Sequence, residues 1–140
     1  NFCHLFNGAL RKTQTIAQIG NVNINYFLYG DEVDYFNRLK QNGKIVTLTN
    51  CFHFHPPRAN NVVSSSWVFY TLKNTIINNF KYRKFPHFYN LAIIFLVLYR
   101  IFIRNGLKQM FSYLIGINAK YYYKAITFGY KRLIGKNKPK

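Results

Sequence analysis

Acidic side chains are nearly absent from this sequence. Its 140 residues include three Asp and Glu against 20 Lys and Arg, which gives a formal net charge of +17 at pH 7. The three acids, Asp31, Glu32 and Asp34, lie within four residues. Repulsion between so many like charges opposes compaction, so we expect a polyanionic partner. Nucleic acid, with one charge per roughly 1.7 Å of duplex, is the densest candidate, and anionic lipid is the second.

Cysteine and paired carboxylates are equally scarce, and their scarcity bears on chemistry. The two cysteines, Cys3 and Cys51, cannot form a disulfide framework. The sequence has no Gly-rich phosphate loop and no nucleophile elbow. A dyad of Cys51 and His53 is the kind of pair that any cysteine near a histidine offers. The sequence therefore predicts a protein that is not an enzyme and that needs no cofactor.

Long hydrophobic runs are missing as well. The most apolar stretch, residues 91–103, is interrupted by Arg100, whereas a transmembrane helix needs about 20 apolar residues. Polar or helix-breaking residues flank it on both sides: Pro86, His87 and Asn90 before it, and Arg104, Asn105 and Gly106 after it. This pattern predicts a buried core helix in a protein that is not an integral membrane protein.

The abundant residues point to the genome rather than to a fold. Phe, Tyr, Asn, Ile and Lys make up half of the chain, while Gly, Ala, Arg and Pro are few. The first group has A/T-rich codons and the second has G/C-rich codons, which indicates mutational pressure in an A/T-rich genome. An organelle is the leading case, with parasite or bacterial genomes as alternatives. No secretory signal or transit peptide is apparent, and an organelle-encoded protein would need neither.

Two segments in the first 60 residues have the alternation of β-strands. Residues 14–29 alternate apolar and polar side chains around Gly20-Asn21, which predicts a β-hairpin. Residues 44–55 alternate in the same way, are rich in β-branched residues and end at Pro56-Pro57, which predicts another strand.

A helix is expected between these strands, at residues 31–42. The three acids fall in its first turn, Lys40 near its end and Gly43 just beyond it, so the charges complement the helix dipole. This accounts for the acidic cluster as local helix chemistry rather than as a metal or catalytic site.

The remainder of the chain has helical spacing. The expected helices cover residues 67–83, capped by Ser66 and ended before Pro86, then 91–103, 107–115 and a last one from Ala119. The sequence thus predicts an α+β fold, with an α+β region at residues 1–60, a helical region at 61–134 and a basic tail at 135–140.

The best metal-site candidate is the stretch Cys51, His53 and His55. Alternate residues of a strand share one face, and Cys3-His4 could complete a set that zinc accepts. The spacing matches no common zinc finger, because alternate ligands diverge along a strand. We therefore favour the alternative in which Phe52 and Phe54 pack inward while the histidines contact solvent or phosphate.

Cations interleaved with aromatic rings form the strongest functional signal. Residues 80–89 and 120–132 mix Lys and Arg with Phe and Tyr, so cations can neutralise phosphates while one or two rings stack on unpaired bases. The cations assigned to RNA binding are Arg83, Lys84, Arg104, Lys108, Lys120, Lys124, Lys131, Arg132, Lys136 and Lys138. Their dispersal over the chain suits an enveloping RNA better than a DNA duplex read by one face.

In general character the chain resembles a mitochondrial ribosomal protein encoded in a protist organelle genome. Residues 98–115 are similar to the first-helix region of the small-subunit ribosomal protein seven family, which reads Phe-Ile-Asn-x-Leu-Met-x-x-Gly-Lys-Lys. Gly106 and Lys108 match that motif, whereas Arg100 and Leu107 depart from it, and the Arg-Arg-x-Gly-Gly arm of the family is absent. The resemblance implies rRNA binding in the small-subunit head, with Lys108 and Arg104 on phosphates.

The leading expectation is a structural rRNA-binding protein of the mitochondrial ribosome, located in the matrix, with rRNA and neighbouring ribosomal proteins as partners. The alternative is an accessory subunit of a respiratory complex of the inner membrane, with residues 88–103 as a membrane-facing helix. A DNA-binding protein of the nucleoid is a third possibility, and the dispersed charge disfavours it.

Overall fold

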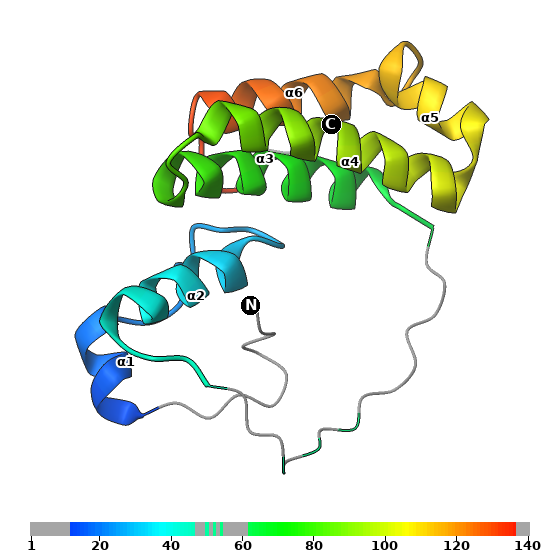
Figure 1. Cartoon of the computed structure of the whole chain (residues 1–140). Helices are drawn as coiled ribbons and strands as arrows, with labels where there is room; N and C mark the ends of the chain where they lie inside the picture. Colours follow the sequence, from blue (N-terminus) through cyan, green and yellow to red (C-terminus); the bar gives the residue numbers. More distant parts are fainter. Residues whose placement is uncertain (1–11, 47–49, 51, 53, 55–61, 137–140) are drawn as a thin grey trace.

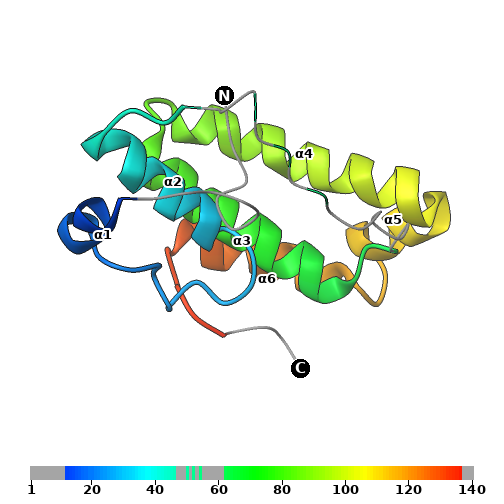
Figure 2. The ribbon, with the colours of Figure 1, turned by 90° about the horizontal axis from the view of Figure 1, so that it is seen from below.

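The computed structural model describes residues 12–46, 50, 52, 54 and 62–136. These residues form six helices: α1 Thr13–Ile19, α2 Asp31–Asn42, α3 Ser65–Tyr82, α4 Pro86–Asn105, α5 Leu107–Leu114 and α6 Ala119–Tyr130. Figures 1 and 2 show α3, α4 and α6 packed together as a three-helix bundle, with α1 and α2 on the side of α3. The part of the chain that the structure describes contains no strand, so the α+β prediction is wrong.

The core lies where α3 meets α4, α5 and α6. Val68, Phe69, Leu72 and Ile76 of α3 are fully buried, because they share one face of the helix. Their neighbours in the core include Val97 and Ile101 of α4, Tyr113 of α5, and Tyr122 and Ala125 of α6.

Gly129 allows α6 to lie directly on α3. A Cβ atom at this position would stand 2.8 Å from Cβ of Ile76. A larger residue would therefore push the two helices apart, and the close contact depends on the absence of a side chain.

Residues 14–29 form α1 and an irregular loop rather than the predicted hairpin. α1 ends at Gly20, and Leu28, Tyr29 and Gly30 all have positive φ angles, of 51°, 57° and 88°, which no strand accommodates. The Asn74 side-chain amide in α3 donates hydrogen bonds to the carbonyls of Leu28 (2.9 Å) and Tyr29 (2.7 Å). The backbone groups that a partner strand would have bonded are therefore satisfied by a helix.

A second asparagine of α3 completes this attachment. The amide of Asn78 donates to the carbonyl of Gly30 at 2.9 Å, and its oxygen accepts from the Tyr26 hydroxyl at 2.7 Å. We call Asn74 and Asn78 the asparagine clip. It fixes residues 26–30 on α3 and so sets where α2 begins.

The predicted strand at 44–55 is also wrong for the residues that the structure describes. Residues 44–46, 52 and 54 have no strand conformation, and Phe52 and Phe54 are exposed rather than packed inward. The alternation is one that mutational pressure toward Phe, Ile, Lys and Asn can produce without a sheet to pair with. The other residues of this stretch, except Asn50, lie outside the described part.

The helical predictions fare better. α2 lies where its acidic first turn and the stop at Asn42-Gly43 predict it. α3 differs from the expected 67–83 by two residues at its start and one at its end. Its start differs because Ser64 rather than Ser66 is the cap, and the Ser64 hydroxyl accepts from the Trp67 amide at 3.2 Å. Pro86 is the first residue of α4, a position where a missing N–H leaves no helical bond unmade.

α4 corrects the prediction of a buried core helix. It is 20 residues long, and only Asn90, Val97 and Ile101 are buried. By length and composition it is the one helix among the described residues that could cross a membrane. The sequence prediction failed because Pro86 begins the helix instead of excluding it, which makes the apolar segment longer than residues 91–103.

Candidate nucleic-acid interface

The cations that the sequence assigns to RNA binding are exposed wherever the structure describes them. Lys138 lies outside the described residues, so its placement stays untested. The exposed members are Arg83, Lys84, Arg104, Lys108, Lys120, Lys124, Lys131, Arg132 and Lys136. Charged groups at the surface keep their hydration and can exchange counterions for phosphates, so each of these positions is available to a polyanion.

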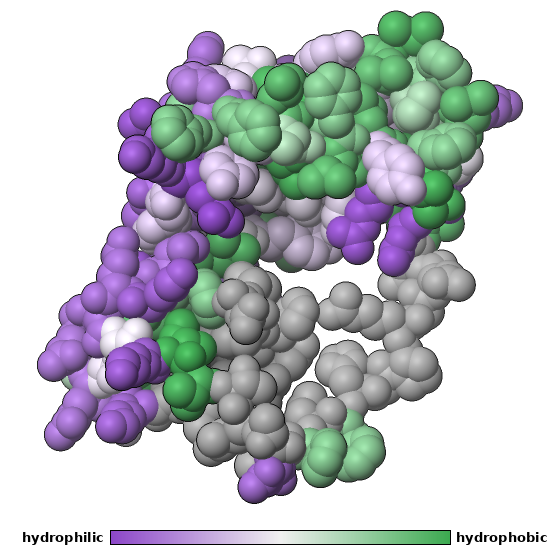
Figure 3. Space-filling view, in the orientation of Figure 1, coloured by the Kyte–Doolittle hydropathy of each residue, from purple (hydrophilic) through white to green (hydrophobic). Residues whose placement is uncertain are grey.

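Several of these cations meet at one end of the bundle of α3, α4 and α6. Arg83 and Lys84 follow α3, and Lys131 and Arg132 follow α6; Figure 1 places the ends of these two helices and the start of α4 together. The Arg132 guanidinium lies 4.9 Å from the ring centroid of Phe80 near the end of α3, which ties the two segments to each other. Figure 3 shows hydrophilic side chains gathered at this end.

The other assigned cations are spread over the rest of the helical bundle. Arg104 and Lys108 lie at the opposite end, where α4 gives way to α5, and Lys120 and Lys124 lie in the first half of α6. The structure therefore brings together one cluster of four and leaves the remaining cations dispersed.

Rings interleaved with the cations act largely as supports for them. Arg83 lies over the Tyr89 ring at 4.8 Å, Lys120 over Tyr121 at 5.3 Å, and Lys136 over Phe27 at 5.1 Å. Such contacts hold a cation close to an aromatic face and restrict its motion. Base stacking by one or two of the rings stays a prediction.

Asp34 is buried and its charge is neutralised inside the protein. Its carboxylate accepts from Lys81 Nζ at 2.7 Å, from the Tyr82 hydroxyl at 2.7 Å and from Arg38 Nε at 3.0 Å. Burial opposes ionisation, but the bonds from Lys81 and Tyr82 and the nearby Arg38 outweigh it and lower the pKa of Asp34. The interpretation of the acids as partners of the helix dipole did not predict this role of Asp34, whose carboxylate joins α2 to α3.

Lys73 differs from the cations described above because its side chain does not reach the surface. It is fully buried, its amine donates to the Gly135 carbonyl at 2.6 Å and lies 5.0 Å from the Tyr70 ring centroid. Burial lowers the pKa of Lys73 to about 8. Its role is to fix the segment after α6 on α3, and helical spacing could have indicated this, since Lys73 lies beside Leu72 and Ile76 on the buried face.

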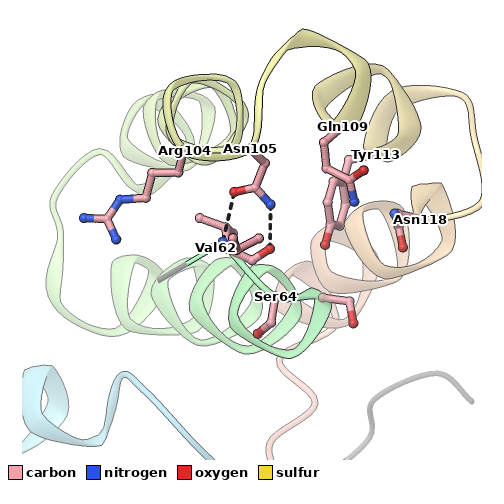
Figure 4. Close-up of a pocket in the computed structure, with 9 residues that line it drawn as sticks. Val62, Ser64, Arg104, Asn105, Gln109, Tyr113 and Asn118 are labelled. Atoms are coloured by element: carbon pink, nitrogen blue, oxygen red, sulfur yellow. Dashed lines mark hydrogen bonds between the residues drawn. The ribbon is translucent and has the colours of Figure 1, made fainter. Parts of the chain in front are cut away.

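An open hollow of about 550 Å³ lies between the start of α3, the end of α4, and α5. The Asn105 side chain forms two hydrogen bonds of 2.9 Å with the backbone of Val63 at its centre, and Tyr113 points from α5 toward the start of α3 (Figure 4). Burial raises the pKa of Tyr113, so its hydroxyl keeps its proton. The lining residues are Val62, Val63, Ser64, Ser65, Arg104, Asn105, Gln109, Tyr113 and Asn118.

None of the residues that line this hollow is acidic, and most carry hydrogen-bond donors. Hydroxyl, amide and guanidinium donors around one space are suited to oxygen acceptors such as those of phosphate. Arg104 stands on the far side of Asn105 from Tyr113 (Figure 4), so it extends the donor surface outward. The sequence motifs selected Arg104 but gave no sign of Gln109, Tyr113 or Asn118.

The metal-site candidates cannot be placed, because Cys3, His4, Cys51, His53 and His55 all lie outside the described residues. Within the described part, no three His, Cys, Asp or Glu side chains come close enough to hold a metal ion.

In comparison with known proteins, no protein-family model, curated protein or solved structure matches this chain.

Proposed function

We propose that the chain is a structural rRNA-binding protein of a mitochondrial ribosome. The observation that carries the proposal is the distribution of charge. The formal net charge is +17, the one fully buried carboxylate is neutralised by Lys81 and Arg38, and every assigned cation that the structure describes is exposed. No acid follows Asp34 in the sequence. The folded chain therefore presents a cationic surface that a polyphosphate compensates.

In this function the protein binds by neutralising phosphates rather than by reading bases. The cluster of Arg83, Lys84, Lys131 and Arg132 bridges phosphates at one end, and the donors around the hollow near Arg104 bind at the other. The small-subunit head is the proposed location, on the resemblance of residues 98–115 alone. A ribosome map with this chain elsewhere would refute the location and leave the RNA proposal standing.

The test is to replace Lys120, Lys124, Lys131 and Arg132 together by Ala. If all four neutralise phosphates, RNA affinity falls, and the slope of log affinity against log salt concentration becomes shallower by about 3. A matched control exchanges Lys and Arg at the same four positions and keeps the charge, so its slope should stay that of the wild type. Unchanged incorporation into ribosomal particles at raised salt would contradict the proposal.

A second candidate, an accessory subunit of a respiratory complex, is favoured by the exposed apolar surface of α4. Sedimentation of detergent-solubilised mitochondria separates the two candidates. Migration with ribosomal subunits supports the first, and migration with inner-membrane complexes supports the second.

A further inference from the structure

The outward side of α4 is apolar along its whole length. With 3.6 residues per turn, its exposed residues fall in one arc opposite the buried Val97 and Ile101. We define the α4 outer face by these exposed residues: Phe88, Leu91, Phe95, Leu96, Tyr99, Phe102 and Ile103. Phe95 and Ile103 are each 61% exposed. Figure 3 shows the apolar surface over α4 continuing over α5.

A helix that is apolar over most of its surface normally has most of that surface covered. Here the described chain covers only one side, through the contacts of α4 with α3 and α5 and a hydrogen bond from Tyr122 of α6 to the Ile94 carbonyl. An exposed apolar surface of this extent marks a binding site. The remaining question is which kind of partner covers it.

Cations line one border of the α4 outer face. Arg83 lies over the ring of Tyr89 at 4.8 Å, and Arg100 lies over the ring of Trp67 at 5.1 Å. Arg104 follows Arg100 by one helical turn on the same border. The surface therefore consists of an apolar strip with a cationic edge, and its partner needs an apolar region beside negative charge.

We infer that the α4 outer face binds the surface of an anionic lipid bilayer, with the helix lying in the plane of the membrane. Aromatic and aliphatic side chains enter the boundary of the acyl chains, and the bordering arginines reach lipid phosphates. RNA fits less well, because Leu and Ile gain nothing from phosphate. A second copy of the chain fits less well, because each copy carries +17.

Lying in the plane preserves the packing that the structure shows. Asn90 of α4 is buried and its side-chain oxygen accepts from the Asn79 amide of α3 at 2.9 Å. α3 also carries the buried Lys73. If α4 spanned the bilayer, it would either lose these contacts or draw polar groups of α3 into hydrocarbon, which is unfavourable.

The experiment is flotation of the full chain with vesicles of phosphatidylcholine and phosphatidylglycerol, compared with vesicles of phosphatidylcholine alone. We expect the wild type to float with the anionic vesicles at physiological salt and to be released by alkaline carbonate. Replacing Phe95 and Ile103 by Ser should weaken vesicle binding about tenfold per residue.

The matched control replaces Phe54 and Ile24 by Ser. These residues are 92% and 91% exposed and belong to none of the six helices, so the control makes the same chemical change without altering the α4 outer face. Equal vesicle binding by the two double variants would overturn the inference, because charge alone would then hold the protein. Retention after carbonate extraction would also overturn it, since that result indicates a spanning helix.

The inference and the proposed RNA function share Arg83 and Arg104, but the apolar residues of the α4 outer face belong to the inference alone, so the two can be tested separately. Both double variants keep every cation, so they should bind RNA as the wild type does. Loss of vesicle binding with normal RNA binding supports the α4 outer face. Normal vesicle behaviour with no RNA affinity in the wild type would refute the RNA proposal alone.

Discussion

At the scale of single residues, buried polar side chains hold separate segments of the chain together. Asp34, Lys73, Asn74, Asn78, Asn79 and Asn90 are all buried. Codon pressure explains why the chain is rich in asparagine, but it does not explain where the amides point. Asn74 and Asn78 bind the backbone of residues 28–30 as a strand would, so an abundant residue type has acquired a structural role at these positions.

The Asp34→Asn variant tests the buried carboxylate. It leaves Lys81 and Arg38 without their counter-charge, and we expect the free energy of unfolding at pH 7 to fall by about 3 kcal/mol. Chemical denaturation provides the measurement. Asp31→Asn in the same helical turn is the control, with an expected loss below about 1 kcal/mol.

The same variant should remove a pH dependence. Because the folded protein lowers the pKa of Asp34 from its usual 3.8, the ionised form contributes stability above that pH. This contribution is lost as the pH falls through the lower pKa of the folded state. The stability difference between wild type and Asp34→Asn should therefore be constant above pH 3.8 and shrink below it. A difference that grew on acidification would contradict this assignment.

At the scale of elements, the loop between α1 and α2 has its shape imposed by α3. Gly30 has a φ angle of 88°, and a Cβ atom there would lie 2.7 Å from Cβ of Asn74. Both the backbone conformation and the contact with the asparagine clip therefore require glycine. Gly30 is the last residue of the loop before α2 begins.

Replacing Gly30 by Ala should destabilise the protein by about 3 kcal/mol, from a strained φ angle together with a clash. Gly20→Ala separates the two effects, because Gly20 also has a positive φ angle, 75°, but has no atom within 4 Å of the added Cβ. We expect Gly20→Ala to lose about 1 kcal/mol. Thermal unfolding followed by circular dichroism measures both, and equal losses would show that the clip exerts no constraint.

At the scale of the whole molecule, charge and apolar surface are unevenly placed. Cations cluster at one end of the bundle of α3, α4 and α6, whereas the α4 outer face is free of charge and bordered by arginines. The same molecule thus has one surface suited to phosphate and a second surface suited to an apolar partner. Together they are the properties expected of a protein held between a polyanion and a second surface.

Self-repulsion at +17 should make stability depend on salt. Raising the ionic strength from ~10 mM to ~150 mM shortens the Debye length from about 30 Å to about 8 Å, which weakens repulsion between surface cations. We expect the melting temperature of the isolated chain to rise over this range, and to rise further when RNA is added at low salt. A melting temperature that falls with salt would mean that attractive ion pairs dominate.

The sequence by itself determined the helices whose signals are local. Acids in the first turn and Gly43 after the last define α2, and apolar spacing defines α3, α5 and α6, because helical hydrogen bonds and caps lie within a few residues of each other. It also determined the surplus of cations, and the structure leaves the assigned ones that it describes on the surface. These features need no information about distant parts of the chain.

Tertiary structure alone decided the conformation of residues 14–29, the burial of Asp34, and the exposure of α4. Alternation favoured strands, but a strand needs a partner with free backbone groups, and α3 offered asparagine amides instead. Apolar composition cannot distinguish a core helix from one that faces outward, since both contain the same residues. Which side of α4 is covered depends on which neighbours pack against it, and among the described residues α3, α5 and Tyr122 of α6 cover one side.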